Sequence, residues 1–105
     1  MKISVIIPAY NEEITIADVI KTVKNVPEIN DIIVVSDGST DDTVAIARGL
    51  NVDVYQMKEN IGKGGAIKRG FEKTVSKEVL FLDADLIGLK QKHVYNLIYT
   101  IKENT

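Results

Sequence analysis

The sequence contains no cysteine and only one histidine, His93, which excludes several kinds of site. Without cysteine there is no disulfide framework, no thiolate nucleophile and no cysteine-ligated zinc. A single histidine cannot form a multi-histidine metal centre, and we assign His93 to the surface of a helix without a functional role. Any metal that this chain holds is therefore expected to have oxygen ligands.

Long apolar runs and blocks of one charge are also missing. The first apolar run, Ile3–Ala9, is too short for the hydrophobic region of a signal peptide, and no stretch approaches the length of a membrane span. The 13 basic and 15 acidic residues are scattered, which gives a net charge of -2 and no basic stripe for a nucleic-acid backbone. We therefore expect a cytoplasmic chain with no transmembrane segment and no nucleic-acid partner.

The composition that is present is that of one ordinary globular domain. The 105 residues include 45% hydrophobic and 27% charged side chains, so we expect a single domain over residues 1–105. Segments rich in β-branched residues predict strands at 2–8, 31–37, 52–58 and 78–85. Apolar residues at helical spacing predict helices around the stripe from Ile14 to Val23 and over 39–49, 62–76 and 90–103.

The order of these elements predicts an α/β fold. The strands at 2–8, 31–37 and 78–85 are apolar at consecutive positions, which is typical of strands covered on both faces. A strand followed by a helix, repeated four times with right-handed crossovers, predicts one parallel sheet between two layers of helices. This is a Rossmann-like, three-layer α/β/α sandwich with a mostly parallel four-stranded sheet. Ser39 or Thr40 is the expected N-cap of the second helix, and Gly49 its stop.

Polar loops follow all four strands. In an open parallel sheet these loops meet at the carboxyl edge, where ligands bind. After the last strand, an extended backbone would place Asp83 and Asp85 on one side, where their carboxylates repel unless a hard cation such as Mg²⁺ or Mn²⁺ lies between them. The alternative is that the two acids only mark the end of a strand and cap the next element.

The other three loops are each ambiguous when taken alone. The carboxylate of Asp37 could accept hydrogen bonds from a base or sugar, with Gly38 allowing close approach, or it could form an Asx turn. Lys63 lies in a glycine-rich segment at a helix start, which suits a phosphate, but the spacing fits neither a Walker A sequence nor a dinucleotide fingerprint. In PAYNEE, Asn11 could cap the first helix and Glu12 could favour its dipole.

Taken together, the segments SVIIPAYNEE, IIVVSDGSTDDT, NIGKGGAIKRGF and VLFLDADL resemble the family 2 glycosyltransferases. The nucleotide-sugar-binding half of these enzymes has the GT-A fold, so the resemblance implies the strand order 3-2-1-4. It runs in order from Ile3 to about Leu89. Dolichyl-phosphate mannosyltransferase-like and glucosyl-3-phosphoglycerate-synthase-like members are the most similar.

The resemblance implies a nucleotide site and a metal site. Asp83 and Asp85 match the DxD motif of the family, in which Asp85 would ligate Mg²⁺ or Mn²⁺ directly and Asp83 would reach the ribose or the metal. Glu12 would lie near the ribose or base, Asp37 would bind the base, and Lys63 would offer a cation to the base oxygens or the diphosphate. The full nucleotide-binding set is Pro8, Ala9, Tyr10, Glu12, Asp37, Gly62, Lys63 and Asp83.

The activity implied is transfer of a sugar, with inversion, from a nucleoside-diphosphate sugar to an acceptor. We favour UDP-sugars as donors, with GDP-sugars as the second choice. In family members the base that deprotonates the acceptor lies well downstream of the DxD motif, so we identify no catalytic residue and expect the base beyond Thr105. The nucleotide-diphospho-sugar-binding part is expected to be present and the acceptor-binding part absent, so that the chain would be inactive alone.

Two other functions are alternatives to this interpretation, and the sequence also predicts one kind of assembly. A non-catalytic nucleotide-binding module, or a subunit completed by a partner chain, is the alternative. A receiver-like signalling domain would need a phosphorylatable aspartate after the third strand, where Lys58, Glu59 and Asn60 stand instead. The fourth strand has an interior-like sequence but would lie at a sheet edge, which predicts a homo-oligomer formed through that edge.

Overall fold

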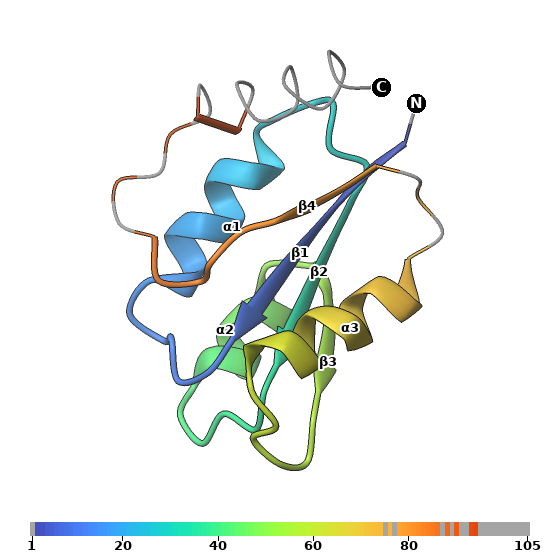
Figure 1. Cartoon of the computed structure of the whole chain (residues 1–105). Helices are drawn as coiled ribbons and strands as arrows, with labels where there is room; N and C mark the ends of the chain where they lie inside the picture. The colour runs from blue at the N-terminus through green and yellow to red at the C-terminus, as the bar shows by residue number, and fades with distance from the viewer. Residues whose placement is uncertain are drawn as a thin grey trace.

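The structure is a computed structural model that describes residues 2–74, 76, 78–86, 88, 90, 93 and 94. Its strands are β1 (Ile3–Ala9), β2 (Asp31–Ser36), β3 (Asp53–Gln56) and β4 (Glu78–Phe81). Its helices are α1 (Ile16–Lys24), α2 (Thr43–Gly49) and α3 (Lys63–Lys73). All strand pairs are parallel and the sheet order is β3-β2-β1-β4, which confirms the order implied by the family resemblance (Figure 1).

β1 is an interior strand of the sheet, because β2 and β4 pair with it on either side. All seven of its residues are buried, which explains its nearly continuous apolar sequence. The register places Ser4 opposite Asp31 in β2 and Ile6 opposite Phe81 in β4. Only four residues of β4 pair with β1, so the pairing on that side is shorter than the pairing with β2.

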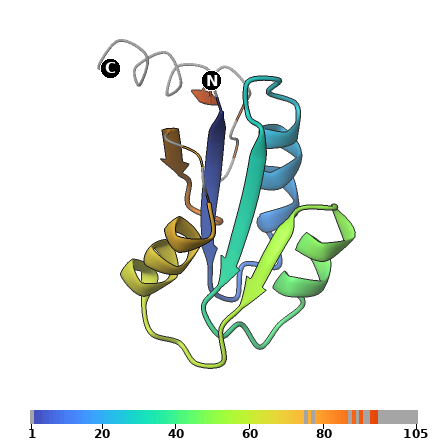
Figure 2. The ribbon, with the colours of Figure 1, turned by 90° about the vertical axis from the view of Figure 1, so that its right-hand side faces the viewer.

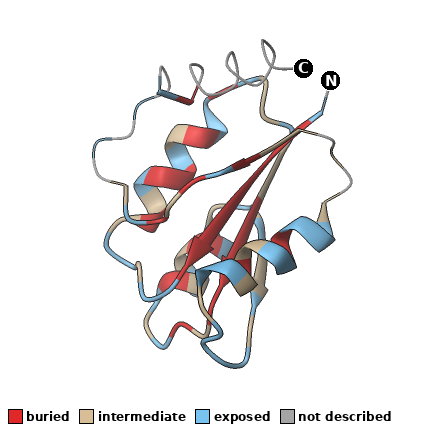
Figure 3. Cartoon of the chain, in the orientation of Figure 1, coloured by how far each residue is buried: buried red, intermediate tan, exposed pale blue. Residues whose placement is uncertain are grey.

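Helices cover both faces of the sheet, so the three predicted layers are confirmed (Figure 2). The larger core lies between the sheet and α1, whose buried side chains are Ile16, Val19, Ile20 and Val23. The smaller core lies under α3 and is formed by Ile6, Ile33, Val35 and Ala66. Each fully buried isoleucine or valine stabilises the fold by about 1.5–3 kcal/mol, and Figure 3 shows this buried material concentrated on the sheet and the inward helix faces.

Gly70 allows α3 to lie close to the sheet. A Cβ at this position would lie 2.6 Å from Cγ2 of Ile6 and 3.2 Å from Cγ2 of Val35. Glycine inside a helix costs about 1 kcal/mol relative to alanine. Here the absence of a side chain is what brings the helix into contact with β1 and β2, so this glycine has a packing reason.

The helices begin later than the sequence predicts. Ile14, expected in the buried stripe of the first helix, is 90% exposed because α1 begins only at Ile16. The N-cap of α2 is Asp42 rather than Ser39 or Thr40, so that prediction was wrong. Gly49 is the last residue of α2 as expected, although Leu50 is its C-cap.

The strands β3 and β4 end earlier than the sequence predicts. β3 ends at Gln56 and β4 ends at Phe81, so the expected extension of the last strand to residue 85 was wrong. Of the expected fourth helix over 90–103, the structure describes only residues 90, 93 and 94, and the remainder lies outside the described residues. His93 is exposed, as expected. In the described part of the chain, none of the helices combines the length and apolar character of a membrane span.

Candidate functional site

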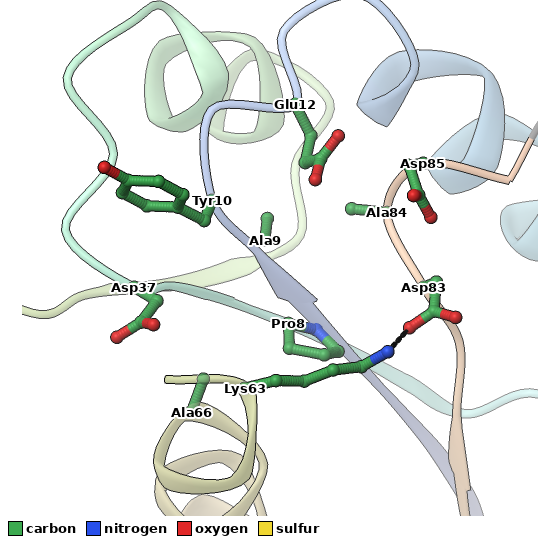
Figure 4. Close-up of a pocket in the computed structure, with 10 residues that line it drawn as sticks. All are labelled: Pro8, Ala9, Tyr10, Glu12, Asp37, Lys63, Ala66, Asp83, Ala84 and Asp85. Carbon is green, nitrogen blue, oxygen red and sulfur yellow. Dashed lines mark hydrogen bonds and ion pairs between the residues drawn. The ribbon is translucent and has the colours of Figure 1, made fainter. Parts of the chain in front are cut away.

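A cavity of about 280 Å³ lies at the carboxyl ends of β1 and β4, beside the first turn of α3 (Figure 4). Four segments that are far apart in the sequence line it. Its lining residues are Pro8, Ala9, Tyr10, Glu12, Asp37, Lys63, Ala66, Asp83, Ala84 and Asp85. The structure thus brings together every residue of the predicted nucleotide and metal sets except Gly62, at the edge of the sheet where the topology places ligands.

Asp83 and Asp85 reach this cavity by a different route from the one predicted. They do not alternate along an extended strand, because β4 has already ended and Ala84 and Asp85 form a turn. The hydroxyl of Thr15 donates a hydrogen bond of 2.6 Å to the carbonyl of Ala84, and Ala84 is only 2% exposed. The buried alanine therefore anchors the turn, and both flanking carboxylates line the cavity.

Lys63 projects across the cavity from the start of α3. Its Nζ donates a hydrogen bond to Oδ1 of Asp83 and forms an ion pair with it (Figure 4). The hydrogen bond to Asp83 is the main reason that the pKa of Lys63 is raised, although partial desolvation opposes it and Asp85 adds a smaller Coulombic contribution. Among the described lining residues, the one cation is thus bound to one of the two acids in the predicted DxD motif.

Glu12 lies in a region of negative potential. Burial raises the pKa of its carboxyl, and the negative charges of Asp85, Asp41 and Asp83 raise it further. The backbone N–H of Glu12 donates a hydrogen bond of 2.9 Å to Oγ1 of Thr43, which ties this segment to the start of α2. The repulsion felt by Glu12 shows that the described lining carries more negative charge than its lysine balances.

Asp37 is buried, with only 4% of its surface exposed, and both of its carboxylate oxygens are occupied. Oδ1 accepts a hydrogen bond from the N–H of Ile61 and Oδ2 accepts one from the N–H of Gly62, each 2.8 Å long. The Asx turn considered as the alternative for Asp37 is not what its carboxylate forms. It holds the loop between β3 and α3 against the end of β2.

The two glycines singled out in the sequence shape this loop rather than the cavity wall. Gly62 has a φ of 98° and is the N-cap of α3, which sets the direction of the helix that begins with Lys63. Gly38 has a φ of 78°, and a Cβ there would lie 2.8 Å from the backbone nitrogen of Asn60. The close approach predicted at Gly38 is therefore made by the protein's own loop.

Sequence reasoning missed the contacts that join the first two loops. Asn11 does not cap α1, since its φ is 52° and its Oδ1 accepts hydrogen bonds from the N–H groups of Thr40 (2.8 Å) and Asp41 (3.3 Å). The N–H of Asn11 in turn donates to Oγ of Ser39 (3.1 Å). The available signal was the density of short polar side chains in both loops, a composition typical of side-chain-to-backbone hydrogen bonding.

The residues present fit a divalent cation whose coordination is completed by the oxygens of a phosphate compound. Among the described residues, no group of three or more histidine, aspartate or glutamate side chains is placed to hold a metal alone. Two carboxylates, Asp83 and Asp85, do line one cavity. Mg²⁺ and similar hard cations are commonly held by one or two carboxylates and completed by water and substrate phosphates.

Comparisons with known proteins agree with these observations. Residues 4–105 match the family described as "Glycosyl transferase family 2". Dolichyl-phosphate beta-glucosyltransferase of Drosophila melanogaster is 37% identical over 101 residues, covering 81% of this chain and 31% of that protein. Glucosyl-3-phosphoglycerate synthase of Mycobacterium tuberculosis is 39% identical over 95 residues, covering 82% of this chain and 29% of that protein. The chain thus spans about a third of the length of these relatives.

Solved structures give the same result. A crystal structure of the M. tuberculosis glucosyl-3-phosphoglycerate synthase with Mn²⁺, UDP and glucosyl-3-phosphoglycerate matches with a TM-score of 0.87 at 33% identity, over 95% of this chain and 39% of that one. A structure of the same enzyme with Mn²⁺, UDP-glucose and phosphoglyceric acid matches equally well, with a TM-score of 0.87, 33% identity and the same coverage of both chains. The GT-A fold expected from the sequence is confirmed, and the chain belongs to glycosyl transferase family 2.

Proposed function

We propose that the cavity binds a nucleoside-diphosphate sugar together with Mg²⁺ or Mn²⁺, and that the chain is the donor-binding part of a glycosyltransferase. The observation that carries this proposal is the convergence of Glu12, Lys63, Asp83 and Asp85 on one cavity of a family 2 fold. The solved relatives that contain Mn²⁺ with UDP or UDP-glucose support it. UDP-sugars are therefore the first donors to test, and GDP-sugars the second.

The metal would be held by Asp83 and Asp85, with diphosphate oxygens and water completing its ligands. Such a cation neutralises the charge that develops on a diphosphate leaving group. Lys63 is close enough to these acids to approach the same diphosphate once it is bound. The carboxylates would then bind the cation, and the lysine would bind the anionic diphosphate of the same metal–nucleotide complex.

The nucleoside would occupy the part of the cavity lined by the end of β1. Pro8 and Ala9 give an apolar wall, and the ring of Tyr10, which is 44% exposed, offers a surface for the ribose or base. Glu12 would reach the ribose or base. Asp37 would bind the base through lone pairs left over after its two backbone hydrogen bonds, because an ionised carboxylate has about four acceptor positions.

Sugar transfer itself belongs to the same proposal, with inversion at the sugar carbon. Inversion requires a base on the face of the sugar opposite the diphosphate. We assign no described residue to that role. A nucleotide-binding module or a subunit completed by a partner chain is the second candidate, since the cavity alone accounts for donor binding.

Calorimetric titration tests the proposal directly. UDP, GDP and UDP-glucose would be titrated with and without Mn²⁺ into the wild type and into Asp85→Asn. We expect binding to require Mn²⁺ and to weaken by about 100-fold or more in the variant. Substituting a residue that only hydrogen-bonds to a metal ligand already lowers metal affinity by about 10–100-fold. Asp53→Asn, the same substitution at the opposite edge of the sheet, is the control and should bind as the wild type does.

Two outcomes would change the proposal. Equal binding by wild type and Asp85→Asn would remove the metal from it. Tight binding without turnover of any offered acceptor would favour the module or the partner-dependent subunit over an enzyme that acts alone. The cytoplasmic location expected from the sequence stays a prediction.

Self-association through β4 is a separate part of the proposal. Within the described residues β4 pairs only with β1, and Phe81 on this strand is 47% exposed. An unpaired apolar edge can pair with a second copy of the chain. Sedimentation at tens of micromolar should therefore show dimers, and a monomer alone at that concentration would contradict this part.

A further inference from the structure

Lys63 stands out because it is the only basic residue in the lining of the cavity, in the part of the chain that the structure describes. Four carboxylates line the same space. One of them, Asp37, already accepts hydrogen bonds from two backbone N–H groups. The other three, from Glu12, Asp83 and Asp85, share a single ammonium group.

The contact between Lys63 and Asp83 is easily exchanged. The side chain extends from α3 past Pro8 to the loop after β4, where Nζ meets Oδ1 of Asp83 (Figure 4). The side chains of the two partners are 60% and 45% exposed, so water competes for both charges. Exposed pairs of this kind are weak, and a more highly charged partner can replace either member.

The stability of α3 does not explain why a lysine stands here. Lys63 occupies the first position of this helix, where the helix dipole disfavours a positive charge. Its backbone is nevertheless fixed, because Asp37 holds the N–H groups of Ile61 and Gly62 immediately before it. The fold therefore places a cation next to the acids at a cost to the helix, and it fixes the backbone of Lys63 while the exposed side chain is held only by its contact with Asp83.

A divalent cation held by Asp83 and Asp85 would compete with the Lys63 ammonium for the carboxylate of Asp83. Asp83 and Asp85 are the two acids assigned to the metal, and Oδ1 of Asp83 is the atom that Lys63 contacts. A divalent cation bound to Asp83 and the Lys63 ammonium would repel each other, so the metal would weaken the contact between Lys63 and Asp83. A bound diphosphate would then give the released ammonium a new anionic partner beside the metal.

We propose that Lys63 is an exchangeable counter-ion that occupies Asp83 in the metal-free protein, opposes binding of the metal alone, and favours binding of the metal together with a nucleoside diphosphate. This inference rests on the proposed donor site and assigns to one residue two effects of opposite sign. The consequence is positive coupling between metal and nucleotide. The protein discriminates against a free divalent cation and accepts the cation with its diphosphate.

The test separates these two effects with Lys63→Met, which keeps an unbranched side chain only one heavy atom shorter and removes its charge. Free Mn²⁺ would be measured by electron paramagnetic resonance in titrations with the metal alone, and UDP binding by calorimetry at saturating Mn²⁺. We expect Mn²⁺ alone to bind about fivefold more tightly to the variant, and UDP to bind about tenfold more weakly. Lys63→Arg keeps the charge and should hold Mn²⁺ alone with wild-type affinity.

Controls and contrary results are distinct for each claim. Lys68→Met changes a lysine of the same helix outside the cavity lining, and should alter neither titration. Unchanged or weaker binding of Mn²⁺ alone by Lys63→Met overturns the counter-ion proposal, even where the wild type binds UDP with Mn²⁺. Failure of the wild type to bind UDP with Mn²⁺ overturns the proposed function instead. The titrations with Mn²⁺ alone still decide whether Lys63 opposes binding of the metal to Asp83.

Discussion

The two ends of β2 carry acids in contrasting surroundings. At the carboxyl end Asp37 is almost fully buried, and both of its oxygens accept hydrogen bonds from backbone N–H groups. At the amino end Asp31 is half-buried and accepts a side-chain hydrogen bond, of 3.3 Å, from the hydroxyl of Ser4. Burial raises the pKa of Asp31, and the nearby charge of Asp53 raises it further.

The difference shows which contacts a carboxylate needs in order to be buried without a loss of stability. Burying a charge is unfavourable unless hydrogen bonds replace the lost water. Asp37 has these bonds and can therefore join two loops of the candidate site. Asp31 accepts a hydrogen bond from Ser4 but is partly buried and also faces the carboxylate of Asp53, and these two effects disfavour its ionised form. The same residue type thus stabilises one end of the strand and destabilises the other.

The largest expected effect comes from breaking the carboxyl end with Gly38→Ala. The added methyl would clash with the backbone of Glu59 and Asn60, and the φ of 78° disfavours any residue with a side chain. We expect the free energy of unfolding, measured in urea, to fall by about 3 kcal/mol. UDP binding should weaken as well, since the displaced loop carries Lys63.

Gly49→Ala is the matched control for this change. Its added Cβ meets nothing within 4 Å, and the residue is helical. Alanine should therefore raise the free energy of unfolding by about 0.5–1 kcal/mol. If both variants changed the free energy of unfolding by the same amount, the close approach of Gly38 to the backbone of Glu59 and Asn60 would not be what holds the two loops in place.

A smaller effect is expected from Asp37→Asn, which keeps the shape of the side chain. An amide offers one oxygen where the carboxylate offers two, so the N–H of either Ile61 or Gly62 would face an NH₂ group. We expect the free energy of unfolding to fall by about 2 kcal/mol, the typical loss for hydrogen bonds to a buried charge. Urea unfolding measures this, and a stability equal to the wild type would contradict the role of Asp37 as the link between β2 and α3.

The order of the elements and the edge that holds the site could be predicted from the sequence. Consecutive apolar residues in β1 and β2 reflect burial on both faces, and the topology of a parallel sheet then fixes where its loops converge. The stripe of α1 was readable in part, because the predicted Val19, Ile20 and Val23 are buried at helical spacing, whereas Ile16, which completes the buried set, was not predicted. Ile14 falls off that spacing, and its exposure could have been expected.

The end of β4 could not be predicted from the same pattern. Leu82 and Ala84 are buried in the larger core, with 6% and 2% of their surfaces exposed, although neither belongs to the strand. An apolar run reports burial, and here burial continues past the last strand residue, through Leu82, whose N–H still donates to the carbonyl of Ile6, to Ala84 in the turn. For this reason the acids at 83 and 85 reach the cavity from a turn and not from an extended strand.

The partners of Asp37 and Lys63 were beyond prediction for a different reason. Asp37 bonds to residues 24 and 25 positions away, and Lys63 bonds to Asp83, 20 positions away. Such contacts depend on how loops from different strands are placed, which no local spacing reveals. The sequence identified these residues as functional candidates, and the structure shows which residues they form hydrogen bonds with.

The smallest expected effect, and the one of opposite sign, is at the amino end of β2. Asp31 has its pKa raised from an ordinary value of 3.8, so the folded state binds its proton more tightly than the unfolded state does. Its favourable contribution is present below that value and is lost as the pH rises through the raised pKa. Asp31→Asn should therefore increase the free energy of unfolding at neutral pH by about 0.5 kcal/mol.

This gain should shrink as the pH is lowered towards 3.8, because the wild-type carboxyl then becomes neutral as well. Urea unfolding of both proteins across that range measures the change, and the difference between them is read at each pH. Asp53→Asn should give a smaller gain, because it removes the repulsion but leaves Asp31 partly buried, and the two substitutions together should give less than their sum because they relieve one repulsion. A loss of stability at neutral pH in Asp31→Asn would mean that the hydrogen bond from Ser4 outweighs the repulsion, and that both ends of β2 obey the same rule.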